Sequence, residues 1–378
     1  MDIAFYGSSL VSAYWNGAAT YYRGIIKALA ARGHRITFYE PDAFDRQKHR
    51  DLPTDPDWAT VVVYEATPRG VAAAVRAGQG ADVLVKASGV GVFDSWLEAA
   101  VLSARRPGGR AVFWDVDAPA TLDRMAANQA DPFRPLVPGY DAVLTYGGGD
   151  PVVRAYGRYG ARICVPVYNA VDPDTHHPAL PDDRFACDLA FLGNRLPDRE
   201  ARVEAFFLEA AARCPDHRFL IGGAGWGDKP MPANVRNLGH VYTADHNALN
   251  CTARAVLNIS RDSMARTGFS PATRVFEAAG AGACLITDAW EGLESFLEPG
   301  REVLVARDGA EVAAHLRDLT PDRAADIGRA ARARVLAEHT YAQRAAQVED
   351  VLTALRNGLP TPVAAGAAAA ADPDRVRA

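Results

Sequence analysis

The sequence lacks the features that mark several classes of protein. No run of apolar residues approaches the roughly 18 that a helix needs to cross a bilayer, and no secretory signal pattern is present. The formal net charge is −5, and neither half of the chain has a cluster of basic residues large enough to bind phosphates. Both observations argue against a nucleic-acid partner. We therefore expect a cytoplasmic protein, for which peripheral contact with a membrane stays open.

Patterns that bind metals or cofactors are also missing. The five cysteines are odd in number and widely spaced, and the chain has no Cys-x-x-Cys and no His-x-x-x-His. This favours reduced thiols over a disulfide framework, and we expect neither a metal nor a bound cofactor. No Gly-x-Gly-x-x-Gly follows the first expected strand, so the dinucleotide fingerprint is absent. The histidines, among them His176, His177 and His339, are best explained as satisfied structural residues.

What the chain does have is length and a repeated α/β pattern. Its 378 residues exceed one typical core and suggest two domains of about 150 to 180 residues. Short apolar runs alternate with helical patterns, which predicts parallel sheets covered on both faces. The expected strands are Ile3–Tyr6, Ile36–Tyr39, Val61–Tyr64, Val83–Ala87, Val112–Trp114, Ala142–Thr145, Leu189–Leu192, Phe219–Ile221, Ala255–Ile259, Cys284–Thr287 and Val303–Val305. The expected helices include Ala18–Ala31, Gly70–Ala77, Ser95–Ala104 and a pattern from Pro321 to Leu355.

Composition suggests where the domains meet. A stretch rich in proline and aspartate makes 167–181 a linker between a first domain at 1–166 and a second at 182–335. A helix at 336–357 follows the second domain. The alanine- and proline-rich residues 358–378 are expected to form a disordered tail.

The most informative segment begins at Ser270, which suits a helix N-cap and precedes a proline suited to the first helical position. Ser270, Arg274 and Glu277 then share one helix face. A helix N-terminus beside an arginine attracts a diphosphate, and Glu277 can accept hydrogen bonds from a ribose. The segment, with Thr273, is therefore predicted to bind the phosphates and ribose of a nucleotide. An ordinary surface pair between Arg274 and Glu277 is the alternative.

This segment resembles the nucleotide-sugar site of GT-B glycosyltransferases, most closely the CgeB-like (spore-maturation-type) branch of the group 1 enzymes. The resemblance runs from Phe191 to Val305 and, more weakly, over the first 25 residues. In the wider group two glutamates lie eight positions apart. Glu277 matches the second, whereas Phe269 stands in place of the first, which favours the CgeB-like branch. The resemblance implies two Rossmann-like domains facing a central cleft, with the C-terminal helix crossing back to the first domain.

Basic residues after two expected strands extend this donor site. The resemblance implies that Arg199, six residues beyond Gly193, meets the diphosphate. Arg261 and Arg266 lie between an expected strand and the donor helix, and one of them is expected to neutralise the leaving group. An exposed arginine at a helix start is the alternative for Arg199.

Glycine-containing loops add four candidates. The turn around Gly223 follows a strand at its carboxyl end and permits close approach to a nucleobase. The loop that holds Gly7, Ser8 and Asn16 is implied by the resemblance to approach donor phosphates or acceptor. For both loops, a flexible or plain connection is the alternative.

Asp115 and Asp117 follow the expected strand Val112–Trp114. A carboxylate there can act as general base toward an acceptor hydroxyl, with Asp117 the first choice and Asp115 the second. The same residues spell Asp-x-Asp, the metal-binding motif of the GT-A fold. Helix capping or a turn is the third interpretation.

The resemblance thus implies a hexosyltransferase-type enzyme that moves a sugar from a nucleotide-sugar donor to an acceptor hydroxyl without a metal. The acceptor, a small molecule, glycan or protein, does not follow from the residues. Three alternatives stay open: a nucleotide-sugar epimerase of the same fold, a GT-A transferase using Asp115 and Asp117 with a metal, and a catalytically silent sugar-nucleotide-binding subunit.

Overall fold

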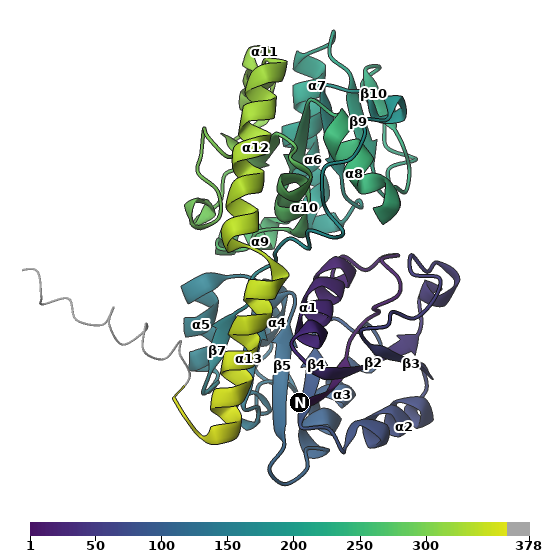
Figure 1. Ribbon diagram of the computed structural model, residues 1–378, viewed down its shortest axis with the longest axis vertical. Coiled ribbons are helices and arrows are strands. Elements are labelled where there is room, and N and C mark those ends of the chain that lie inside the picture. The colour runs from purple at the N-terminus through teal and green to yellow at the C-terminus, as the bar shows by residue number, and fades with distance from the viewer. Residues whose placement is uncertain (361–378) are drawn as a thin grey trace, which may run out of the picture. The chain divides into compact units, whose positions relative to one another are not determined.

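A computed structural model describes residues 1–360 of the chain (Figure 1). The chain divides into two compact units. Unit 1 contains Met1–Tyr168 and the described residues from Ala342 onward, and unit 2 contains Asn169–Tyr341. Most of the expected tail, at 361–378, lies outside the described residues. No helix of the described chain combines the length and apolar character that a membrane span requires.

Unit 1 is built on a seven-stranded parallel sheet with strand order β3-β2-β1-β4-β5-β6-β7. Its strands are β1 (Asp2–Tyr6), β2 (Arg35–Asp42), β3 (Thr60–Glu65), β4 (Val83–Ala87), β5 (Arg110–Asp115), β6 (Ala142–Thr145) and β7 (Cys164–Pro166). Its helices are α1 (Ala19–Ala31), α2 (Pro68–Gly78), α3 (Asp94–Ser103), α4 (Ala118–Ala127), α5 (Gly149–Arg158) and α13 (Tyr341–Asn357). The first residue of α13, Tyr341, is counted with unit 2.

Both faces of this sheet are covered, which explains its continuous apolar strands. Helices α2 and α3 pack with Tyr6 and Leu84 on one face, and α4 and α5 extend that layer over Phe113. On the opposite face Phe5 meets Tyr22 of α1, with ring centroids 5.5 Å apart. The alternation of Phe5 and Tyr6 follows from the two-residue period of a strand.

Unit 2 repeats this design with a six-stranded parallel sheet, in the order β10-β9-β8-β11-β12-β13. Its strands are β8 (Leu189–Leu192), β9 (Phe219–Gly222), β10 (Val235–Asn237), β11 (Ala255–Asn258), β12 (Leu285–Asp288) and β13 (Leu304–Ala306). Its helices are α6 (Pro197–Val203), α7 (Glu209–Arg213), α8 (Thr243–Thr252), α9 (Asp262–Thr267), α10 (Thr273–Ala281), α11 (Gly309–Asp318) and α12 (Pro321–Glu338).

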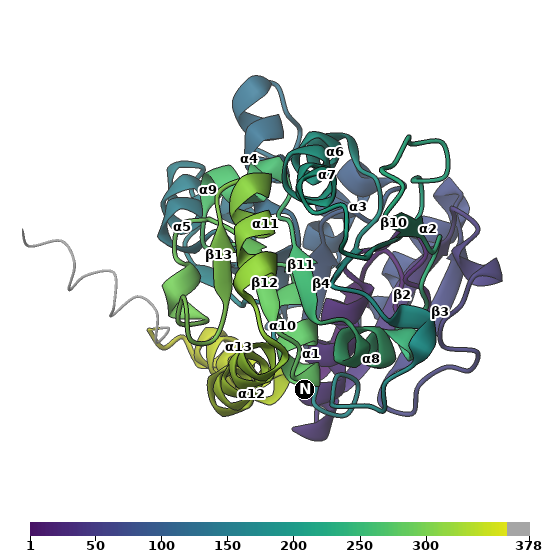
Figure 2. The ribbon, with the colours of Figure 1, turned by 90° about the horizontal axis from the view of Figure 1, so that it is seen from above.

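Helices α6, α7 and α11 close the main core of unit 2 over Phe191, Leu257 and Ile286. Helix α10 packs against α8 and α12, and Figure 2 shows α10 and α12 close together. In each sheet the chain adds strands first on one side of its first strand and then on the other, so the strand order reverses beside β1 and beside β8. In open parallel sheets ligands bind at the carboxyl ends of the strands near such a point, which in unit 2 lies between β8 and β11.

The predicted parallel α/β architecture is confirmed, with three local corrections. The short strands β7 and β10 are not among the strands that the sequence predicts. The helical pattern from Pro321 to Leu355 is two helices, because the chain breaks at His339 and Thr340. There Val171 donates to the His339 carbonyl at 2.9 Å and accepts from the Tyr341 N–H at 3.0 Å, so these backbone groups pair with Val171.

The third correction concerns Ser270. Helix α10 begins at Thr273 with Ala272 as N-cap, and no side chain caps it. The Ser270 hydroxyl instead donates to the Gly268 carbonyl at 2.8 Å. The carbonyl of Pro271 accepts from the Asn169 side chain at 2.8 Å, which fixes the segment before the helix. The first-turn N–H groups of α10 therefore receive no side-chain cap from Ser270.

Candidate donor site of unit 2

Arg274 and Glu277 lie one turn apart near the start of α10 and form a buried ion pair. Arg274 Nη1 is 3.1 Å from Glu277 Oε2, and the two side chains are only 12% and 4% exposed. Such i,i+3 pairs contribute little when water surrounds them, but burial strengthens their electrostatic interaction. The pair is thus not the ordinary surface pair that was the alternative. Thr273, predicted with them, is the first residue of α10.

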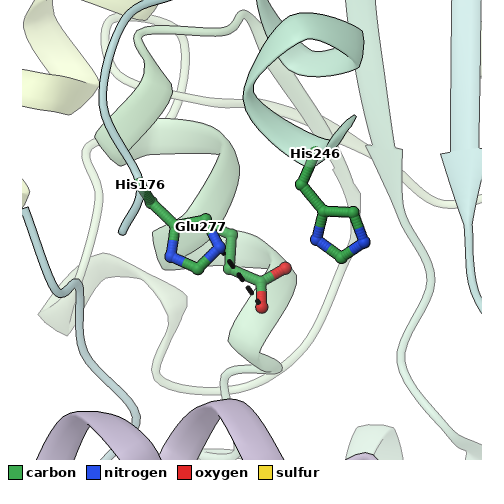
Figure 3. Close-up of side chains that lie close together, drawn as sticks. All are labelled: His176, His246 and Glu277. Carbon is green, nitrogen blue, oxygen red and sulfur yellow. Dashed lines mark ion pairs between the residues drawn. The ribbon is translucent and has the colours of Figure 1, made fainter. Parts of the chain in front are cut away.

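Two histidines that the sequence analysis treated as structural lie beside this pair. His176 Nε2 is 3.9 Å from Glu277 Oε1, and His246 comes from α8 (Figure 3). Ligand atoms of the three side chains all lie within 4.8 Å of one another. Burial lowers the pKa of His176, and burial with the nearby Arg274 charge lowers the pKa of His246 to about 4. Both imidazoles are therefore neutral at neutral pH.

Nothing in the sequence pattern signalled this cluster. His176 lies in the linker, His246 on α8 and Glu277 on α10, so only the tertiary fold brings them together. His176 also contradicts the expectation of a satisfied histidine, because its buried Nε2 makes no hydrogen bond in the described part of the chain.

The predicted basic residues lie in the segments that follow β8 and β11. Arg199 is in the first turn of α6, and Arg261 is the N-cap residue of α9, which contacts α6. Arg261 Nε donates to Asp198 Oδ2 at 2.6 Å. Arg266, at the far end of α9, is 65% exposed and pairs with Asp262 at 3.0 Å. Arg199 and Arg261 therefore belong to one region, and Arg266 is the most exposed of the three.

Gly193 and Gly223 allow the two loops beside Arg199 to touch. A Cβ at Gly193 would lie 2.9 Å from Arg199 Nη1, and one at Gly223 would lie 2.2 Å from the Gly193 carbonyl oxygen. Gly223 also has φ = 129°, which side-chain-bearing residues rarely adopt. Trp226 Nε1 donates to the same Gly193 carbonyl at 2.7 Å. The glycines are thus required by close packing, which brings backbone amides of two loops near Arg199.

The predicted residues of the first loop in unit 1 support that loop internally. Ser8 Oγ donates to Asn16 Oδ1 at 2.9 Å, and Asn16 Nδ2 donates to the carbonyls of Ser9 and Ser12 at 2.9 and 3.0 Å. A Cβ at Gly7 would lie 2.4 Å from Phe38 Cζ, so the loop begins against a ring. Ser8 and Asn16 are buried, and their side chains fix the conformation of the loop.

Asp115 and Asp117 differ sharply in environment. Asp115 is fully buried and accepts from Ser88 Oγ at 2.7 Å, Thr121 Oγ1 at 3.1 Å and the Asp117 N–H at 3.0 Å. The Tyr156 hydroxyl also donates to it. Burial raises the pKa of Asp115. Asp115 thus joins the end of β5 to the residue that follows β4 and to α4 and α5. The half-buried Asp117 occupies the N-cap position of α4 without capping it.

The chain is similar to known proteins in part of its sequence and in its fold. Residues 199–350 match the profile of the family described as Glycosyl transferase-like. Sucrose-phosphate synthase from Thermosynechococcus elongatus superposes with a TM-score of 0.70 at 15% identity, covering 95% of this chain and 100% of that one. Anabaena HepE in complex with UDP-glucose gives a TM-score of 0.66 at 16% identity, covering 94% and 100%. No curated protein shows significant sequence similarity.

The chain therefore has the GT-B fold of the glycosyltransferase structures that it matches, as predicted. Its two parallel-sheet domains are the two Rossmann-like domains of that architecture.

Proposed function

We propose that the protein is a glycosyltransferase that moves a sugar, of hexosyl type, from a nucleotide-sugar donor to an acceptor hydroxyl. The observation that carries the proposal is the buried Arg274–Glu277 pair at the start of α10, at 3.1 Å, within a GT-B fold. A solved relative in fold, Anabaena HepE, is described in complex with UDP-glucose, which supports a nucleotide-sugar partner. The CgeB-like branch and a cytoplasmic location are part of the proposal.

In this proposal Glu277 accepts hydrogen bonds from the ribose hydroxyls, and the first turn of α10 attracts the diphosphate. The N–H groups of that turn and the positive end of the helix dipole favour an anion, and Ser270 does not cap them. Arg199 and Arg261 add positive charge from α6 and from the start of α9. Departure of a nucleoside diphosphate develops negative charge, which preorganised donors stabilise by several kcal/mol without a metal.

Phe269 occupies the position where the wider group carries its first glutamate. Its backbone has φ = 46°, and its N–H donates to the Glu291 carbonyl at 2.6 Å. A Cβ at Gly292 would lie 2.2 Å from the Phe269 ring, so the ring is packed against that turn. An apolar ring cannot accept hydrogen bonds from sugar hydroxyls. This departure supports the CgeB-like branch and means that other groups contact the donor sugar.

The three alternative functions are not equally supported. A GT-A mechanism with Asp115 and Asp117 as metal ligands is disfavoured, because Asp115 is fully buried and already accepts four hydrogen bonds. An epimerase or a silent binding subunit would share the donor site. Only a measurement of sugar transfer to acceptors therefore distinguishes these two functions from that of a transferase.

The test is binding of nucleoside diphosphates and nucleotide sugars, measured by thermal shift and calorimetry. A ligand at 100 times its dissociation constant should stabilise the protein by about 2.7 kcal/mol. We expect the double variant Arg274→Met/Glu277→Gln, which removes both charges together, to lose this shift while keeping its circular dichroism. Glu298→Gln is the matched control, since Glu298 forms an exposed i,i+3 pair with Arg301. A parent that binds no nucleotide, or a double variant that binds like the parent, would overturn the proposal.

A further inference from the structure

His176, His246 and Glu277 converge although they come from three separate segments of unit 2. Figure 3 shows the two imidazole rings on either side of the Glu277 carboxylate, and the ligand atoms of all three lie within 4.8 Å of one another. His176 and Glu277 are buried, at 2% and 3% exposure. Two imidazole nitrogens and one carboxylate oxygen at this spacing need only small side-chain movements to reach a common ion at about 2.0–2.2 Å.

Each of the two histidines has a buried ring nitrogen without a hydrogen bond. His246 Nε2 is 3.3 Å from the Val241 carbonyl, which can only accept, so this contact assigns the ring proton to Nε2. Nδ1 then carries a lone pair, and it is buried without a hydrogen bond in the described chain. The buried Nε2 of His176 makes none either. Buried polar atoms without partners are costly, and a metal ion would satisfy both nitrogens at once.

The surroundings resemble the outer shell that orients metal ligands. A ligating histidine usually donates its other N–H to a carbonyl or carboxylate, as His246 does toward Val241. Ligating carboxylates are usually held by a neighbouring polar group, and here Arg274 Nη1 forms an ion pair with Glu277 Oε2 at 3.1 Å, while Oε1 is 3.9 Å from His176 Nε2. Arg274 thereby pairs with one oxygen of the carboxylate, and the other oxygen is the one that pairs with His176.

We propose that His176, His246 and Glu277 form a binding site for a divalent transition-metal ion of borderline softness, with Zn²⁺ as the probe. Two imidazoles and one carboxylate suit Zn²⁺, Ni²⁺, Co²⁺ and Cu²⁺. Mg²⁺ and Ca²⁺ prefer sets made wholly of oxygen. The site is therefore selective for zinc-like ions over magnesium.

The consequence for activity rests on the proposed function. Glu277 is the residue assigned to the donor ribose, so an ion on its carboxylate competes with the donor for one side chain. The ion is then an inhibitor of donor binding and takes no part in sugar transfer. The metal site itself does not depend on this link, because the convergence of its ligand atoms within 4.8 Å does not require Glu277 to contact a ribose.

The experiment uses full-length protein without a histidine tag, stripped with chelator and titrated calorimetrically with ZnCl₂ and, separately, MgCl₂. We expect one Zn²⁺ per chain and no detectable Mg²⁺ binding. Co²⁺ should give visible absorption bands that report nitrogen ligation. His176→Ala and His246→Ala should each weaken Zn²⁺ binding at least tenfold, and His177→Ala should not, because that neighbouring imidazole is exposed.

Parent protein that fails to bind Zn²⁺, or a His176→Ala/His246→Ala double variant that is folded by circular dichroism and binds Zn²⁺ like the parent, would overturn the metal site. Binding of UDP to the metal-free parent is measured in parallel. UDP binding without Zn²⁺ binding removes only the metal site, and Zn²⁺ binding without nucleotide binding removes only the proposed function.

Discussion

Arg202 Nη2 donates to Asp288 Oδ2 at 2.6 Å and so ties helix α6 to the carboxyl end of β12. Asp288 is fully buried and also accepts from the Ser260 N–H at 3.1 Å and the Ser260 hydroxyl at 3.2 Å. The same helix carries Arg199, and Ser260 immediately precedes Arg261. One buried carboxylate therefore holds both segments that present the proposed diphosphate ligands.

Replacing Arg202 tests this support. Arg202→Met leaves the Asp288 carboxylate buried without its counter-charge, so we expect the free energy of unfolding to fall by about 3 kcal/mol, the lower end of the usual range, because Arg202 is 22% exposed. Urea denaturation at neutral pH measures the loss. Arg301→Met, which breaks an exposed pair with Glu298, is the control and should change stability little. Equal stability of parent and Arg202→Met would show that the pair does not secure α6.

The deficit of Arg202→Met should depend on pH. Burial raises the pKa of Asp288, and Arg202 opposes that rise. A raised folded-state pKa makes the folded protein bind more protons than the unfolded chain, so this group's contribution to stability falls as pH rises through the window above 3.8. Without Arg202 the pKa rises further and the fall is larger. The difference between variant and parent should therefore be greatest near pH 7.5 and shrink toward about pH 4.5. A deficit that stays constant with pH would contradict this electrostatic origin.

The sequence predicted features whose signal is local. Strands such as Val83–Ala87 and Leu189–Leu192 were found with their observed bounds, because buried parallel strands are continuous apolar runs. Arg274 and Glu277 were identified because helical spacing places them on one face. The three-residue strands β7 and β10 were missed, since so short a run carries little pattern.

Other features depend on contacts between distant segments. Ser270 has the chemistry of an N-cap, yet its hydroxyl donates to Gly268 and the helix starts three residues later. At the break, the backbone groups of His339 and Tyr341 pair with Val171 in the linker. His176 and His246 reach Glu277 only through the fold of unit 2. Local propensity cannot reveal such tertiary effects.

Removing metal should leave donor binding intact. The proposed diphosphate ligands are arginines and helix N–H groups, so EDTA should not change UDP affinity, as measured by calorimetry. Added Zn²⁺ should weaken UDP binding in proportion to its own occupancy, and His246→Ala should relieve this inhibition. Loss of UDP binding in EDTA with recovery in Mn²⁺ would instead favour a metal-bridged diphosphate and the GT-A reading.

The arginine assignments predict a selective loss of phosphate recognition. Arg199→Ala and Arg266→Ala should weaken binding of UDP while leaving uridine binding unchanged, with the larger effect, about tenfold, at Arg199 because it is less exposed. Arg213→Ala is the control, since Arg213 pairs with Glu209 on the surface of α7. Urea denaturation should show a change of at most about 1 kcal/mol for Arg199→Ala. If both variants bind UDP like the parent, the phosphate assignment is wrong.

Substitutions at Asp117 and Asp115 should affect different quantities, turnover for Asp117 and stability for Asp115. We predict that Asp117 is the acceptor base, so Asp117→Asn should lower kcat by about 10²- to 10⁴-fold and leave UDP binding nearly unchanged. Asp115→Asn should act mainly on stability, by about 1–3 kcal/mol, because an amide cannot accept all of the hydrogen bonds donated by Ser88, Thr121, Tyr156 and the Asp117 N–H. Turnover with an accepted sugar acceptor and urea denaturation of both variants give the comparison. Near-normal turnover in Asp117→Asn would place the base elsewhere, or indicate a retaining mechanism, in which the protein need not supply one.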